Sequence, residues 1–190
     1  MEWVLLALAL LLLVAYGWYV ALISRRNKAR EALASIDVHL QKRHDMVPNV
    51  LKLAQKFMTH EKDLLERLTA LRAEVGRDYR RTDPQEVERH LGAAKELDAG
   101  MARLFAVAEN YPELRSSDTV VQAQRTYGEV ENQIAAARRF YNASVNSLNT
   151  AIEVFPGSLI AGMAGVRPMP FYEVETAEAR KAVDVDDYLK

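Results

Sequence analysis

Two pairs of ionisable residues in this sequence have side chains that could do chemistry. His44 is followed by Asp45, and His60 is followed by Glu61. Imidazole and carboxylate groups both bind metal ions, and imidazole also exchanges protons near neutral pH. On one straight helix the two histidines would lie about 24 Å apart, so a shared site would need groups from other helices. A metal-dependent enzyme or sensor built on these residues is therefore one hypothesis for function.

The sequence motifs of known enzymes do not support this hypothesis. The chain contains no Glu-x-x-His or His-Glu-x-x-His motif, no Gly-rich phosphate loop and no Gly-x-Ser-x-Gly nucleophile elbow. It has no cysteine, which excludes disulfides, thiolate metal ligands and cysteine nucleophiles. The 25 basic and 26 acidic residues nearly cancel, and no basic helix with interleaved aromatic residues indicates a nucleic-acid partner. We therefore predict no catalytic residues and no cofactor, metal or nucleic-acid ligand.

The segment from Arg43 to Asn49 interrupts an otherwise regular helical pattern. Arg43 occupies a position where the seven-residue apolar spacing requires a core residue, which predicts a buried polar partner or a gap in the packing. Pro48 lacks a backbone donor and crowds the preceding turn, which predicts a bend in the helix. A loop is disfavoured because the apolar spacing resumes in phase at Val47. The candidate structural or interaction residues of this segment are Arg43, His44, Asp45, Pro48 and Asn49.

Three asparagines lie on one face of the most regular predicted helix, in which an apolar residue recurs at every seventh position from Val120 to Phe155. Asn142, Asn146 and Asn149 fall within about 80° of arc beside the apolar seam. Asparagine lowers helix stability by up to about 0.7 kcal/mol relative to alanine, so three on one face suggest partners elsewhere in the chain. The alternative is a solvated flank. We favour partnered asparagines that specify packing rather than catalyse a reaction.

An uncharged apolar segment covers residues 3–24. As a helix it would be about 33 Å long, which matches the hydrocarbon core of a bilayer at about 30 Å. The alternative, a cleaved signal peptide, would have a basic start, a shorter apolar core and a small-residue cleavage site. Only Glu2 precedes the core here, and a charged helical pattern continues directly from it. We therefore predict a retained transmembrane anchor that contacts the lipid bilayer.

The residues that flank this segment predict its orientation. No basic residue precedes it, whereas four lie between positions 25 and 30. Such clusters stay in the cytoplasm and contact anionic headgroups, and aromatic side chains favour the membrane interface. The N-terminus is then outside and residues 25–190 are inside; an exported domain is the alternative. The predicted interface residues are Trp3, Trp18, Tyr19, Arg25, Arg26, Lys28 and Arg30.

Apolar periodicity predicts an all-α protein. Long helices are expected over residues 27–78, 84–110 and 117–155, joined by short turns in an antiparallel up-down bundle. The uncharged stretch Leu159–Val166 predicts a short fourth helix that closes the bundle, with contact to a membrane or partner as the alternative. The acidic C-terminal end is expected to be loose in solvent. The predicted division is an anchor (1–24), a bundle (25–155) and a closing helix with a tail (156–190).

Motifs in a fixed order resemble the LemA family. They are SIDVHLQKRHDMVPNVL at Ser35–Leu51, MTHE at Met58–Glu61, and then AENYPEL, ENQIAAARRFYN and a final FP. The resemblance covers residues 35–172 and implies a bacterial inner-membrane protein with one N-terminal transmembrane helix and a helical bundle. The family has no established enzymatic activity and so supplies no catalytic residues. Some members are tied to membrane organisation or to protein quality control, which the resemblance implies here as well. Our leading hypothesis is a non-enzymatic scaffold with unidentified membrane or cytoplasmic partners, or one that self-associates as a homo-oligomer.

Overall fold

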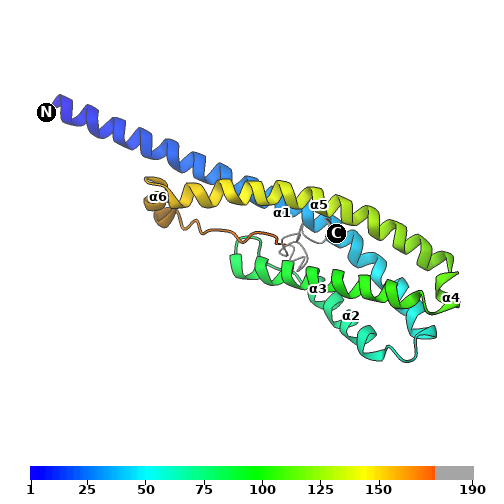
Figure 1. Ribbon diagram of the computed structural model, residues 1–190. Coiled ribbons are helices and arrows are strands. Elements are labelled where there is room, and N and C mark those ends of the chain that lie inside the picture. Colours follow the sequence, from blue (N-terminus) through cyan, green and yellow to red (C-terminus); the bar gives the residue numbers. More distant parts are fainter. Residues whose placement is uncertain (174–190) are drawn as a thin grey trace, which may run out of the picture.

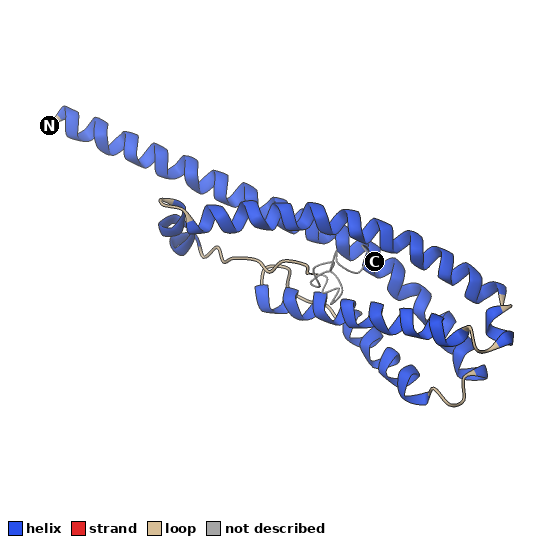
Figure 2. Ribbon diagram, viewed as in Figure 1, coloured by secondary structure: helices blue, strands red, loops and turns tan. Residues whose placement is uncertain are grey.

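The computed structural model describes residues 1–173, which form six helices and no strand (Figure 1). The helices are α1 (Glu2–Phe57), α2 (Lys62–Val75), α3 (Pro84–Ala108), α4 (Pro112–Arg115), α5 (Asp118–Glu153) and α6 (Gly157–Ala164). Short loops connect them, and an extended segment follows α6 (Figure 2). The prediction of an all-α protein is confirmed for this part of the chain.

The two halves of α1 lie in different surroundings. Residues 1–20 project from the bundle (Figure 1), and nearly all of their apolar side chains are exposed. By length and composition this segment could cross a membrane. From Leu22 onward the same helix enters the core, where Leu22, Ala29 and Leu33 are at most 1% exposed. One continuous helix therefore joins the apolar projection to the centre of the bundle.

The helix predicted over residues 27–78 is in fact two helices. α1 ends at Phe57, the chain turns through Met58–Glu61, and α2 packs against both α1 and α3. Met58 is only 1% exposed, so an apolar side chain anchors this turn in the core. The seven-residue spacing crosses the turn because both helices bury their apolar positions in one core, and spacing alone cannot reveal the reversal. α1 continues through Pro48 without ending, and the bend expected there stays a prediction.

Two helix pairs build the bundle. α1 packs along α5 and α2 packs along α3, and successive long helices run in alternating directions (Figure 1). The seventh-position residues of α5 from Val120 to Leu148 are buried, as predicted. Phe155 is an exception: it is 78% exposed, because α5 ends at Glu153 and the helical spacing does not apply beyond that residue.

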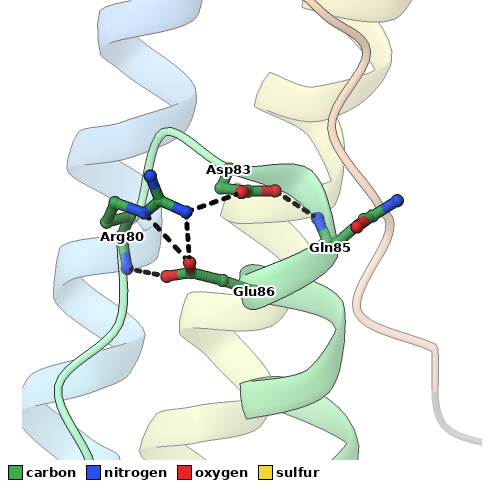
Figure 3. Close-up of polar contacts among 4 residues, drawn as sticks. All are labelled: Arg80, Asp83, Gln85 and Glu86. Carbon is green, nitrogen blue, oxygen red and sulfur yellow. Dashed lines mark hydrogen bonds and ion pairs between the residues drawn. The ribbon is translucent and has the colours of Figure 1, made fainter.

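Charged groups hold the loop before α3 (Figure 3). Pro84 begins α3, and Asp83 Oδ1 accepts a hydrogen bond of 3.0 Å from the backbone amide of Gln85. Arg80 donates to the Glu86 carboxylate from Nε at 2.9 Å, from Nη2 at 2.6 Å and from its backbone amide at 2.6 Å. Acidic side chains suit a helix N-terminus, where free amides carry partial positive charge. These contacts fix the start of α3 and hold the loop between α2 and α3 against it.

α6 and an extended segment complete the described chain. α6 packs against both α1 and α5, and it is the short helix predicted over Leu159–Val166. Gly165 ends it with a φ of 63°, in the left-handed region that glycine enters without strain. Residues 166–173 then run back along the bundle (Figure 1). The acidic end that was expected to be loose, residues 184–190, lies outside the described part of the chain.

Candidate functional site

Arg43 lies in the core at 2% exposure and contacts three side chains from other helices. Its Nη1 lies 3.0 Å from Asp98 Oδ1 of α3, and its Nη2 contacts the carboxylate of Glu131 on α5. The guanidinium carbon lies 4.6 Å from the centroid of the Tyr127 ring. We term Arg43, Asp98, Tyr127 and Glu131 the charge centre. It joins α1, α3 and α5 through one buried cation.

The charge centre suits packing rather than catalysis. Arginine stays protonated at physiological pH and cannot act as a base. The Tyr127 hydroxyl donates a 2.7 Å hydrogen bond to Asp98 Oδ1. Burial raises the pKa of Tyr127 well above its ordinary value, although the charge of Arg43 acts in the opposite direction. The hydroxyl therefore stays protonated and serves as a fixed donor.

A second polar cluster joins α1 to the loop before α3. Asp37 is 14% exposed, and its carboxylate accepts hydrogen bonds from the Tyr79 hydroxyl at 2.7 Å and from Arg81 Nε at 2.6 Å. His90 stacks on Tyr79 with the ring centroids 4.0 Å apart, and its Nε2 lies 3.6 Å from Asp37 Oδ1. We term these four residues the Asp37 cluster. They border a polar cavity of about 160 Å³, which His44 also lines.

Replacing Asp37 with Asn is expected to remove a pH-dependent part of the stability. Burial alone raises the pKa of this carboxyl, but contacts with His90, Tyr79 and Arg81 outweigh burial and hold the pKa below its ordinary value. A group with a lower pKa in the folded state stabilises the fold above the unfolded-state pKa of about 3.9, and this stabilisation is lost as the pH falls through the folded-state pKa.

Urea unfolding midpoints of the two proteins check this prediction. They should differ most near pH 7, begin to converge below about pH 4, and meet once the pH has fallen through the lower folded-state pKa of Asp37. A difference that stays constant across this range would mean that the charge of Asp37 contributes nothing.

Two of the three candidate asparagines hold the C-terminal extended segment. Asn142 donates from Nδ2 to the Tyr172 carbonyl at 3.1 Å and accepts at Oδ1 from the Tyr172 amide at 2.9 Å. Asn149 donates to the Met169 carbonyl at 2.9 Å and accepts from the Met169 amide at 3.0 Å. We term Asn142 and Asn149 the asparagine clamp. Each side chain satisfies both backbone polar groups of one residue, as a neighbouring strand would.

The spacing of the clamp matches the chain that it holds. Seven residues of α-helix rise about 10.5 Å, and three residues of polyproline-type chain rise about 9.3 Å. Every third residue of the segment is buried: Val166, Met169 and Tyr172 are 5%, 6% and 6% exposed. Pro168 and Pro170, between them, favour an extended chain. Two turns of α5 therefore hold one three-residue repeat of the segment.

The Arg43–Asn49 segment is divided between the core and the surface. Arg43 points inward and is not available to a partner, whereas Asp45 is 63% exposed. His44 is 16% exposed, Pro48 is half-buried and Asn49 is exposed. The structure therefore does not bring these five residues together as one site, and their role in interaction stays a prediction.

The remaining candidates lie at the surface or along α1. Asn146 is exposed, and no described residue forms a hydrogen bond with its side chain, so it is the solvated member of the three asparagines. Of the predicted interface residues, Trp3, Tyr19 and Lys28 are exposed, and Trp18, Arg25, Arg26 and Arg30 are half-buried.

The hypothesis of a metal-dependent enzyme or sensor is not favoured. His60 is exposed in the turn that separates α1 from α2, and His44 lies within α1 beside Gly76 at the end of α2. Within residues 1–173, no three His, Asp or Glu side chains come together as metal ligands.

Five residues of these clusters could not be singled out from the sequence: Asp37, Tyr79, Arg81, His90 and Asp98. Asp37 and Asp98 each follow a buried core position, but acidic residues at helix flanks are common, so neither stands out. Tyr79 and Arg81 lie in a loop, where periodicity offers no guide.

Comparison with known proteins gives one family and three relatives. A model of the LemA family matches residues 32–186, which confirms the resemblance of the motifs. Magnetosome proteins MamQ 1 and MamQ 2 of Paramagnetospirillum magneticum are each 31% identical over 87 residues, which is 46% of this chain and 32% of theirs. Magnetosome protein MamQ of Magnetospirillum gryphiswaldense is 25% identical over 197 residues, covering 90% of this chain and 72% of that protein. The chain thus matches only about a third of the length of the two Paramagnetospirillum proteins.

Proposed function

Because this chain belongs to the LemA family, we propose that it is a membrane-anchored, non-enzymatic helical bundle that holds other proteins at a bacterial inner membrane. Residues 3–24 cross the bilayer once, with the N-terminus outside and the bundle in the cytoplasm. The basic residues that follow the anchor support this orientation.

The observation that carries the proposal is the change of surroundings along α1. The side chains of residues 1–20 form an apolar surface whose exposure to water is unfavourable. The rest of the chain covers almost none of that surface. The same helix then becomes the core element that α5 packs along. An anchor and a bundle that share one helix have a fixed relative orientation, so the bundle presents the same faces to other proteins at the membrane.

A scaffold agrees with the chemistry of the described residues. Within the charge centre, buried Arg43 is paired with Asp98 and Glu131, and within the Asp37 cluster, Asp37 is paired with Tyr79 and Arg81. These contacts join elements of the bundle to one another. The relatives bear names of magnetosome proteins, and such names fit a part of an assembled cell structure better than an enzyme of small-molecule turnover.

The outward face of α1 is the partner surface that we propose. It exposes Val38, Asp45 and Asn49. Asp45 follows Val38 by seven residues and precedes Asn49 by four, so the three side chains share one side of the helix. Val38 is 56% exposed although it is apolar. Anchoring to a membrane raises the effective concentration of this face toward membrane partners.

Proximity labelling in living cells tests this proposal. A biotin ligase fused after Lys190 should label a set of cytoplasmic-side proteins that the same ligase on an unrelated single-span anchor does not. Val38→Asp should reduce that set. Val121→Asp should leave it unchanged, because Val121 is an exposed apolar residue on a different helix, α5. A set identical to that of the unrelated anchor would refute the scaffold, and labelling of proteins outside the cytoplasm would refute the orientation.

A further inference from the structure

The turn between α5 and α6, together with α6 itself, carries an exposed apolar surface. The thirteen residues from Val154 to Val166 contain no charged side chain. Phe155, Leu159 and Met163 are 78%, 62% and 84% exposed, and they recur at four-residue spacing. Leu159 and Met163 lie on one face of α6, because side chains four residues apart in a helix share a face, and Phe155 lies in the turn before α6. We term Phe155, Leu159 and Met163 the α6 apolar face.

This face lies at the end of the bundle from which the apolar half of α1 projects. α6 packs against both α1 and α5, and it lies at the opposite end of α5 from α4 (Figure 1). Gly157 is buried at the start of α6, and a methyl group placed on it would lie 3.7 Å from the Trp18 ring. The start of α6 therefore lies beside Trp18, near the bundle end of the exposed apolar surface of residues 3–20.

The position of Trp18 gives the depth of α6. Trp18 precedes Ser24, the last residue of the uncharged segment, by six residues, which is about 9 Å along a helix. Helices that lie in a membrane interface bury their apolar face about 5–10 Å into the boundary between headgroups and acyl chains. Arg25 and Arg26 on α1, and Arg167 after α6, then fall at the level of the headgroups.

We propose that α6 is a second membrane contact, which inserts its apolar face into the cytoplasmic leaflet beside the transmembrane half of α1. This inference rests on the proposed function, because it requires residues 3–24 to span the bilayer. Lipid is the partner that best fits the face, since it carries no charge and adjoins a surface of lipid-facing composition. With two contacts, the tilt of the bundle relative to the membrane is fixed.

Spin-label depth measurements on the full chain in phosphatidylcholine–phosphatidylglycerol vesicles test this proposal. The chain has no cysteine, so single substitutions give one label each. Labels at Met163→Cys and Leu159→Cys report on α6, and a label at Leu10→Cys reports on the anchor. Val121→Cys is the matched control, because it is an exposed apolar residue near the far end of α5. Circular dichroism checks that each labelled protein keeps its helices.

The two α6 labels should collide more often with oxygen, which concentrates in lipid, than with a water-soluble nickel complex, as the Leu10 label should. The Val121 label should show the opposite ratio. If an α6 label shows the oxygen-to-nickel collision ratio of the Val121 label while the Leu10 label lies in lipid, the α6 contact is overturned and the anchor is left intact. A Leu10 label in water would overturn the anchor and the inference with it. Low collision with both reagents, with dipolar broadening between labels, would show that a second copy covers the face and would also overturn the inference.

Discussion

The double replacement Asp98→Asn with Glu131→Gln is expected to lower the free energy of unfolding by about 3–5 kcal/mol, because it leaves Arg43 as a buried cation without a counter-charge. Arg43 is 2% exposed, so water cannot solvate it in place of the lost carboxylates. Arg43→Met should have a smaller effect. It removes the buried charge and leaves Asp98 and Glu131, which are 37% and 43% exposed, in contact with water.

Denaturant unfolding of the full chain in mild detergent, followed by circular dichroism, measures these differences. Glu96→Gln is the matched control, because Glu96 also lies on α3 and forms an ion pair with Arg67. Both members of this pair are exposed, Arg67 at 68% and Glu96 at 58%. Exposed pairs contribute about 0–1 kcal/mol, so this variant should stay close to the parent protein. Adding Arg43→Met to the double variant should restore most of the lost stability. If the double variant is no less stable than the Glu96 variant, Arg43 does not depend on its counter-charges.

Breaking the asparagine clamp is the second change with a large expected effect. Asn142→Ala and Asn149→Ala each remove two hydrogen bonds to the backbone of residues 166–173. A net contribution of about 0.5–1.5 kcal/mol for each bond gives an expected loss of about 1–3 kcal/mol for each variant. The extended segment should also open locally more often, because its amide groups at Met169 and Tyr172 lose their acceptors.

Hydrogen–deuterium exchange of the peptide that covers residues 166–173 detects this opening. Exchange should be faster in both clamp variants than in the parent protein. Asn146→Ala is the control on the same helix, because Asn146 is exposed and holds nothing in the described chain; its effect should stay within about 0.5 kcal/mol. Equal exchange in the Asn146 and Asn149 variants would show that burial of the segment, rather than the clamp, holds it in place.

Features that depend on local periodicity could be predicted from the sequence. The apolar start of α1, the seventh-position seam of α5 and the short α6 each follow from the composition of one segment. Arg43 and the asparagines also stood out locally, because a charge in an apolar seam and repeated asparagine in a helix both oppose the local preference. Such residues predict that a partner exists, but they do not identify it.

Features that depend on chain reversal or on distant residues could not be predicted. The turn at Met58–Glu61 was missed because the same seven-residue spacing continues on both sides of it. The partners of Arg43 lie 55 and 88 residues further along the chain, at Asp98 and Glu131, and only the packing of three helices brings them together. The partner of the clamp was missed for a similar reason, although two prolines after α6 are a signal of an extended segment that needs backbone partners.

The central claim, that residues 3–24 stay on the chain as a membrane anchor, is tested most directly by alkaline carbonate extraction of membranes, followed by mass measurement of the protein in each fraction. The expected result is a chain of 21.5 kDa that remains in the membrane pellet, because a spanning helix resists extraction whereas peripheral proteins are released. A shorter chain that lacks the apolar start of α1 and appears in the soluble fraction would contradict it.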